Sequence, residues 1–153
     1  MKKIQIILCS LIMLLMQTVA IAGSASPVGL WRTIDDATGK QKSIIRISEN
    51  RGVLSGKIVK IFPRPGHYKN GLCDTCEGQY KNKKLEGVTV LRGMSPESKK
   101  SGTWSGGKIT DPKNGKTYRC TMTISGNGRT LDVRGYVGVQ FLGRTQVWRR
   151  VSR

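Results

Sequence analysis

The sequence predicts a single all-β domain, an eight-stranded antiparallel barrel of the up-and-down type. The chain has 19 glycines and frequent turn signals, and these separate eight short runs of strand-forming residues. The clearest runs alternate apolar and polar residues, so each strand has one apolar and one polar face. Outside the N-terminal segment, no stretch has a helical period. A meander of this kind that closes into a barrel buries its apolar faces together and leaves no unpaired edge strand.

The N-terminal segment has the three parts of a cleavable export signal. Lys2 and Lys3 provide a positive start, residues 4–16 are almost entirely apolar, and residues 20–22 have the small-x-small pattern that precedes a cleavage site. A retained membrane anchor is the alternative. It is disfavoured because the apolar run is shorter than the ~20 residues that a spanning helix needs.

We expect cleavage between Ala22 and Gly23. Residues 1–22 would then be the signal peptide, and residues 23–153 would be the mature barrel domain. The mature protein is therefore expected to be periplasmic or secreted.

Three runs open the mature domain, at residues 28–34, 42–48 and 53–61. The segments between them, 36–39 and 49–52, contain the Asp, Asn and Gly residues that favour tight turns. Short turns make neighbouring strands antiparallel.

A long polar connection follows at residues 62–86. It contains His67, Cys73, Cys76 and several lysines. A loop of this length inside a small domain is usually functional or mobile.

Five further runs complete the barrel, at residues 87–92, 103–110, 116–125, 130–137 and 144–151. In the sixth run of the barrel, Tyr118, Cys120, Met122 and Ile124 share one face, opposite Thr117, Arg119, Thr121 and Thr123. In the seventh, Leu131, Val133 and Val137 oppose Asp132, Arg134 and Tyr136.

The last turn, at residues 138–143, is apolar where a polar turn is expected. It is interpreted either as a plug folded over one end of the barrel, or as a lid or contact patch for a membrane or partner.

The chain is strongly basic, with 27 Lys and Arg against nine Asp and Glu and a net charge of +18. Loss of Lys2 and Lys3 with the signal lowers this charge to +16. Such a field attracts anionic surfaces. For an exported protein we expect an anionic membrane surface or another envelope component as partner and no nucleic acid. A basic surface that serves only solubility is the alternative.

Many motifs, in order, resemble the exported bacterial family known as domain of unknown function 2147. The resemblance runs from about Pro27 to Val151, and it implies a lipocalin-like antiparallel barrel with no assigned activity. The motifs that carry it are Ser26-Pro27-Val28-Gly29-Leu30-Trp31, Thr33-Ile34-Asp35-Asp36, Gly39-Lys40, Cys73-x-x-Cys76, residues 104–109, Asp111-Pro112, residues 114–118, Cys120, residues 133–138, Gly143-Arg144-Thr145-Gln146 and Trp148.

The first strand also resembles the Gly-x-Trp motif that closes one end of lipocalin-like barrels. Gly29 and Trp31 carry this resemblance. It implies a cation–π contact from a basic side chain of the last strand, worth about 0.5–2 kcal/mol. We assign this structural role to Arg144, with Arg149 and Arg150 as alternatives.

The cysteines offer three interpretations. A structural disulfide between Cys73 and Cys76 is favoured, since an exported protein meets an oxidising environment. A redox site would need a helix N-terminus, and a zinc site built on His67 and the two thiols would lack a fourth ligand. We therefore predict no metal and no cofactor, and we expect Cys120 to be a buried, inert thiol.

No catalytic constellation is found, so the protein is predicted not to be an enzyme. His67 is the single histidine, and no nucleophile turn or pair of converging carboxylates accompanies it. Binding of a small apolar or anionic molecule inside the barrel is the favoured function. Docking on an envelope surface and a thiol or metal function are the alternatives. Candidate ligand-binding residues are Arg46, Trp104, Tyr118, Arg134, Tyr136 and Trp148.

Overall fold

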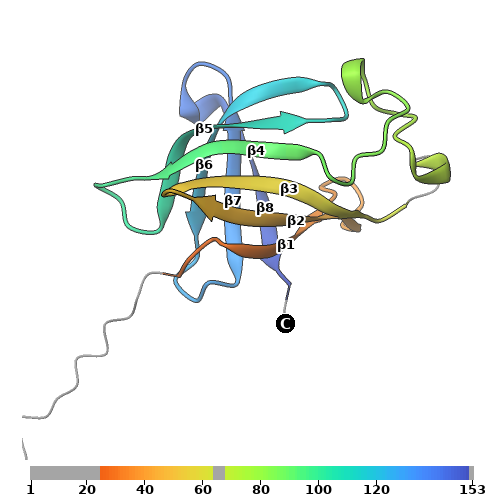
Figure 1. Cartoon of the computed structure of the whole chain (residues 1–153). Coiled ribbons are helices and arrows are strands. Elements are labelled where there is room, and N and C mark those ends of the chain that lie inside the picture. The colour runs from red at the N-terminus through yellow and green to blue at the C-terminus, as the bar shows by residue number, and fades with distance from the viewer. Residues whose placement is uncertain (1–24, 64–67, 152–153) are drawn as a thin grey trace, which may run out of the picture.

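The computed structural model describes residues 25–63 and 68–151, which form one closed antiparallel barrel (Figure 1). The predicted cleavage site and His67 lie outside these residues. The strands are β1 (Gly29–Ile34), β2 (Gln41–Asn50), β3 (Val53–Ile61), β4 (Thr89–Pro96), β5 (Thr103–Asp111), β6 (Lys116–Ile124), β7 (Thr130–Tyr136) and β8 (Arg144–Arg150).

Each strand pairs with its neighbours in sequence, and β8 returns to β1. Antiparallel pairing of Trp31 with Arg150 and of Arg32 with Arg149 makes this last contact. The backbone N–H of Val151 also donates to the carbonyl of Leu30 at 2.9 Å. The predicted eight-stranded up-and-down barrel is confirmed.

Strand β4 is longer than the predicted run 87–92, because Gly93-Met94-Ser95-Pro96 continues the strand although it resembles a turn. Gly93 has a positive φ of 72° and lies against Gly107 of β5. This local twist lets the strand continue to Pro96, which pairs with Trp104.

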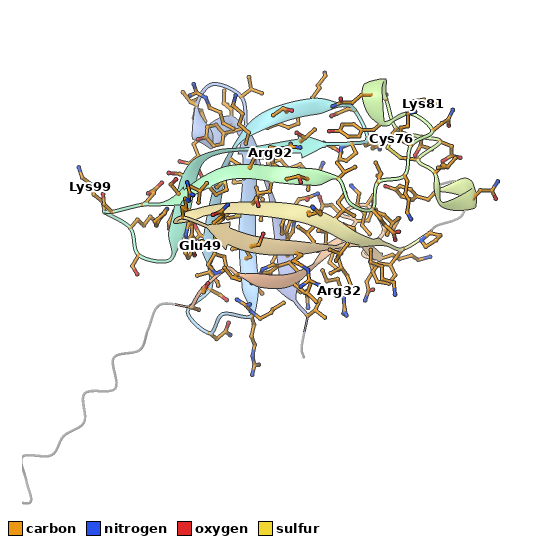
Figure 2. The ribbon with its side chains drawn as sticks, in the orientation of Figure 1. Arg32, Glu49, Cys76, Lys81, Arg92 and Lys99 are labelled. Atoms are coloured by element: carbon orange, nitrogen blue, oxygen red, sulfur yellow. A yellow bond between two sulfur atoms is a disulfide. The ribbon has the colours of Figure 1, made fainter. Side chains whose placement is uncertain are left out.

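The connections alternate between two ends of the barrel. We call the end with turns 51–52, 97–102 and 125–129 the closed end, and the end with connections 35–40, 62–88, 112–115 and 137–143 the open end. Figure 2 shows Glu49 and Lys99 toward the closed end, and Cys76 and Lys81 on the long connection at the open end. This connection contains two short 3₁₀ turns, η2 (Lys69–Gly71) and η3 (Gly78–Tyr80).

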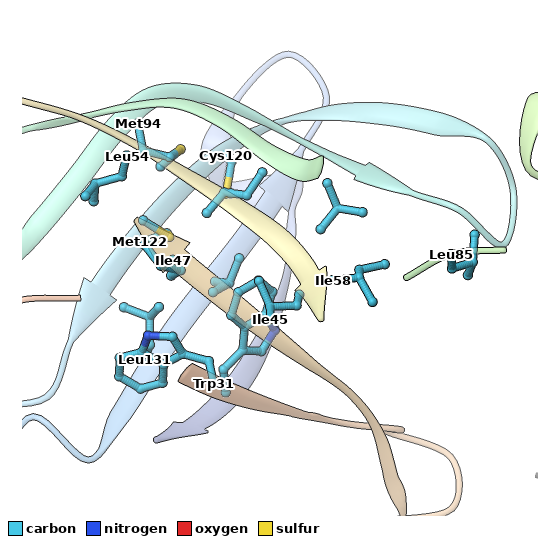
Figure 3. Packing of buried hydrophobic residues seen from close by; sticks show 14 of the residues in the cluster. Trp31, Ile45, Ile47, Leu54, Ile58, Leu85, Met94, Cys120, Met122 and Leu131 are labelled. Atoms are coloured by element: carbon cyan, nitrogen blue, oxygen red, sulfur yellow. The ribbon is translucent and has the colours of Figure 1, made fainter. Parts of the chain in front are cut away.

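The closed half of the barrel is packed with apolar side chains. Figure 3 shows this cluster, with Ile58 and Leu85 farther along toward the open end. The side chains that fill it are almost fully buried: Trp31, Ile47, Leu54, Leu91, Met94, Cys120, Met122 and Leu131. The predicted inward face of β6 is confirmed at Cys120, Met122 and Ile124, all of which are buried.

Trp31 and Arg150 close this end together. The Arg150 guanidinium lies 4.3 Å from the Trp31 ring centroid, and the indole N–H donates to the carbonyl of Pro27 at 2.7 Å. Gly29 is favoured here, because its φ of 137° is a conformation that other residues rarely adopt, and a Cβ would also lie 2.9 Å from a guanidinium nitrogen of Arg150. Partial burial lowers the pKa of Arg150.

The assignment of this closing role to Arg144 was wrong. Because β8 runs antiparallel to β1 and Trp31 pairs with Arg150, Arg144 lies at the opposite end of its strand. There it forms an ion pair with Asp36.

Among the described residues, no helix has the length and apolar character needed to cross a membrane.

Candidate functional site

The open half of the barrel encloses a cavity of about 630 Å³. This volume is within the usual range for sites that take small molecules. Trp148, Val133 and Ile45 are among its deep lining residues, and all three are buried from solvent. Ile58 and Val90 add further apolar wall. The inner part of the cavity therefore suits an apolar group.

A layer of hydroxyl and amide groups lies nearer the opening. The hydroxyls of Thr33 and Ser43 are 2.7 Å apart and share a hydrogen bond. The side-chain amide of Asn114 donates to the Tyr118 hydroxyl at 3.0 Å. These groups already satisfy one another, so the cavity needs no polar ligand to pair them.

Charged residues surround the mouth of the cavity. Lys42 and Lys113 line it together with Asp111 and Arg144. A second, more polar hollow of about 420 Å³ adjoins the cavity and shares these four residues. Arg144 is paired with Asp36, whereas the amines of Lys42 and Lys113 have no hydrogen-bond or ion-pair partner among the described residues. Within the described part of the chain, the mouth therefore presents the amines of Lys42 and Lys113 without a partner.

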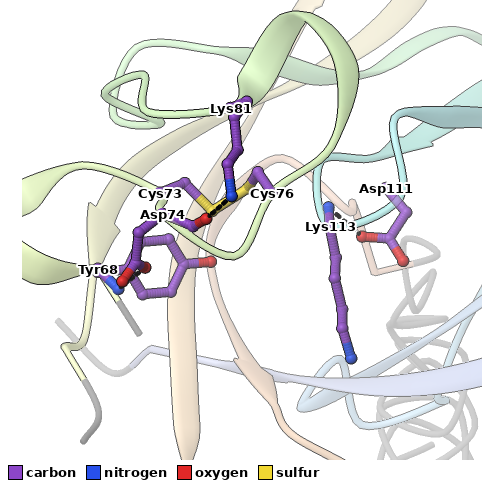
Figure 4. Close-up of a disulfide and its surroundings, with 7 residues drawn as sticks. All are labelled: Tyr68, Cys73, Asp74, Cys76, Lys81, Asp111 and Lys113. Atoms are coloured by element: carbon purple, nitrogen blue, oxygen red, sulfur yellow. Dashed lines mark hydrogen bonds between the residues drawn. A yellow bond between two sulfur atoms is a disulfide. The ribbon is translucent and has the colours of Figure 1, made fainter. Parts of the chain in front are cut away.

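The long connection contains a disulfide between Cys73 and Cys76, which closes a small loop within it (Figure 4). Both cysteines are buried, and Cys73 faces the polar hollow. The Lys81 amine donates to the carbonyl of Asp74, and the Asp74 carboxylate accepts from the backbone N–H of Tyr68 at 3.1 Å. The predicted disulfide is confirmed, and it constrains the part of the connection that borders the polar hollow.

The disulfide engages both thiols that the metal interpretation requires. Among the described residues, no group of three or more His, Cys, Asp and Glu side chains could hold a metal ion.

The connection between β7 and β8 forms the opposite part of the rim and contains the 3₁₀ turn η4 (Gln140–Leu142). Leu142 and Val137 contribute to the cavity lining, but their side chains are exposed, as is Phe141. The interpretation of this turn as a plug was wrong, since its apolar side chains are largely exposed to solvent and only Val137 and Leu142 border the cavity. The turn forms an apolar rim at the opening.

The family model described as "Uncharacterized protein conserved in bacteria (DUF2147)" matches residues 29–150. This chain belongs to that family. The match covers all eight strands, so the family resemblance seen in the sequence is confirmed.

A solved structure supports the same fold. Protein HP1028 from the human pathogen Helicobacter pylori, described as belonging to the lipocalin family, superimposes with a TM-score of 0.64. The two proteins are 21% identical, and 84% of each chain is covered. This DUF2147 chain therefore has a lipocalin-like barrel. No curated protein matches its sequence.

Three of the six predicted ligand-binding residues line the cavity of this DUF2147 barrel: Tyr118, Tyr136 and Trp148. Trp148 is deep, whereas the two tyrosines are half-buried nearer the opening.

The other three predicted residues do not line the cavity. Arg46 is exposed, because Ile45 and Ile47 occupy the inward positions of β2. Trp104 is half-buried against the packed core. Arg134 points outward between the inward positions of Val133 and Gly135 and binds the β7–β8 turn.

Sequence reasoning missed Lys42, Lys113 and Gln146, all of which line both hollows. Gln146 could have been found, since it is two residues from Trp148 and therefore shares its face of β8. The lysines carry no such signal, because they lie where a strand begins or a turn reverses the chain.

Proposed function

We propose that this DUF2147 protein is an exported binding protein that holds a small amphiphile in the open half of its barrel. The observation that carries the proposal is the cavity of about 630 Å³ above a fully packed closed half. A barrel of eight strands has room for one such ligand.

The lining supports a ligand with two chemically different ends. The apolar wall around Trp148 and Val133 suits a hydrocarbon or aromatic body. The two unpaired amines of Lys42 and Lys113 at the mouth suit an anionic end, such as a carboxylate, sulfonate or phosphate. Binding in this proposal involves no chemical step.

A matched pair of fluorescent probes tests both ends of the proposed ligand. Anilinonaphthalene sulfonate and phenylnaphthylamine share an apolar body, but only the first is anionic. Both probes should bind with a fluorescence increase, and the anionic probe should bind more tightly. Val133→Phe fills the cavity and should weaken both probes. Val147→Phe adds the same group on the outward face of β8 and should weaken neither.

The lysines are tested separately. Lys42→Gln and Lys113→Gln should each weaken the sulfonate roughly fivefold, since about 1 kcal/mol corresponds to that factor, and should leave the neutral probe unchanged. Lys100→Gln, an exposed lysine at the closed end, is the control. If Val133→Phe and Val147→Phe bind both probes equally well, the cavity is not the binding site and the proposal fails.

A further inference from the structure

The apolar rim of the barrel, residues 137–142, is the most exposed apolar segment among the described residues. The exposed fractions are 71% for Val137, 54% for Val139, 79% for Phe141 and 70% for Leu142. Isolated exposed apolar side chains are ordinary, but four within six residues form a patch that usually marks an interaction site.

This rim is held in an ordered conformation. The Arg134 guanidinium donates to the carbonyls of Gln140 and Phe141 and to the hydroxyl of Thr145, each at 2.8 Å. The backbone N–H groups of Leu142 and Gly143 donate to the carbonyls of Val139 and Gln140. These contacts hold the backbone of the turn in a conformation that leaves more than half of each apolar side chain exposed. Because the turn is already ordered, little conformational entropy would be lost when its side chains enter an apolar medium.

Basic side chains lie around the apolar rim. At the open end, Lys113 lies in the β5–β6 turn and Lys116 begins β6, and both are exposed. At the same end, Lys60 lies 5.0 Å from the ring centroid of Phe62. Two of the acidic side chains at this end are already paired, Asp36 with Arg144 and Glu86 with Lys84.

We propose that the open end docks on a phospholipid bilayer that contains anionic headgroups. Phe141 and Leu142 would enter the boundary between headgroups and acyl chains, and Lys113 and Lys116 would lie against headgroup phosphates. Apolar insertion and basic attraction together are what interfacial binding requires. A second copy of the chain fits poorly, because each mature chain would carry a net charge of +16 and the two open ends would repel. Lys113 also lies at the mouth of the cavity, whereas Phe141 and Lys116 do not line it, so the docking is tested through Phe141.

Vesicle co-sedimentation tests the proposal with residues 23–153, whose described part forms a closed barrel with its own core. The protein should pellet with vesicles of phosphatidylcholine mixed with phosphatidylglycerol, and only weakly with phosphatidylcholine alone. Added salt should weaken the binding, because exposed charges are screened within about 8 Å at physiological ionic strength.

Phe141→Ser is the decisive variant. It should weaken the partitioning onto mixed vesicles at least about tenfold, since the Phe side chain would no longer be transferred out of water. Val53→Ser removes an exposed apolar side chain at the closed end and should change nothing. Phe141→Trp should keep the binding, and brominated lipids should quench the added tryptophan.

The proposal is overturned if Phe141→Ser and Val53→Ser pellet equally, or if bromination leaves the Phe141→Trp fluorescence unchanged. A concentration-dependent dimer in sedimentation that Phe141→Ser abolishes, without vesicle binding by the unaltered chain, would also overturn it in favour of a contact between copies.

Discussion

At the scale of single residues, Arg150 connects three parts of the closed end. Its guanidinium covers Trp31 and donates to the carbonyls of Ser26, Val28 and Gly128. These carbonyls belong to the segment that enters β1 and to the β6–β7 turn. One side chain therefore ties the first strand to the last and to a neighbouring hairpin.

Arg150→Ala should lower the free energy of unfolding by about 2 kcal/mol, from the lost cation–π contact and the lost charged hydrogen bonds. Arg149→Ala, an exposed arginine beside it, should cost less than about 0.5 kcal/mol. Urea denaturation monitored by tryptophan fluorescence compares them. Equal midpoints for the two variants would contradict this role of Arg150.

Cys120 is a second residue with a measurable consequence. Its thiol is fully buried, and burial raises its pKa from 9.0 to about 12 because the thiolate would lose its hydration. Folding therefore favours the protonated thiol. The protonated Cys120 thiol makes its full contribution to the free energy of unfolding below the pKa of the unfolded state. That contribution is lost as pH rises from about 9 to about 12.

We expect native protein to resist a thiol reagent at mildly alkaline pH and to react once urea unfolds it. The difference in unfolding free energy between the unaltered chain and Cys120→Ala should also shrink as pH rises above 9.0. Rapid labelling of the native protein would contradict this prediction, because it would show that the Cys120 thiol is accessible to the reagent.

At the scale of elements, β4 and β5 approach each other closely at a bulge. A Cβ on Gly107 would lie 2.4 Å from the carbonyl oxygen of Arg92 and 2.4 Å from the sulfur of Met94. The bulge lies in β5, whose pairing register with β6 shifts between Trp104 and Gly107, whereas its register with β4 is unbroken. The two strands can therefore stay paired only with glycine at this position.

Gly107→Ala should destabilise the barrel by about 2–4 kcal/mol, because an added methyl group must displace backbone. Gly126→Ala is the matched control, since its Cβ would meet no atom within 4 Å and its φ is not positive. Thermal unfolding should separate the two variants by several degrees. Similar melting temperatures for the two variants would contradict this prediction, because they would mean that β4 and β5 can move apart without loss of stability.

At the scale of the whole molecule, the barrel separates a packed half from a hollow half. The apolar rim lies outside the cavity, although Leu142 and Val137 touch both. Phe141 does not line the cavity, so cavity binding and docking can be altered independently.

This separation predicts opposite responses from two variants. Val133→Phe should weaken both fluorescent probes and leave vesicle binding intact, whereas Phe141→Ser should weaken vesicle binding and leave both probes intact. Probe titration and vesicle co-sedimentation on the same preparations measure the probe affinity and the vesicle binding of each variant. A parallel loss of both activities in either variant would show that the two sites are one.

The sequence predicts the strands well because their signals are local. The run 53–61 coincides with β3, and the alternation along residues 118–124 correctly orients β6. The partner of Trp31 depends on the stagger between the first and last strands. No local pattern specifies that stagger, so Arg144 was chosen where Arg150 makes the contact.

The cavity is harder to predict for a similar reason. Ile45 and Ile47 look identical in the alternating pattern of β2, yet Ile47 belongs to the packed half and Ile45 lines the hollow. Whether space remains inside a barrel depends on the summed volumes of side chains from all eight strands, and on the connections that cover the opening.

An even number of strands has one more consequence for this chain. The segment that enters β1 and the segment that leaves β8 emerge side by side at the closed end, where Arg150 joins them. A tether attached at either place, such as a fused reporter or a sensor chip, would hold the barrel by its base. The ligand opening and the Phe141 rim would then point away from the support, free to meet whatever is presented to them.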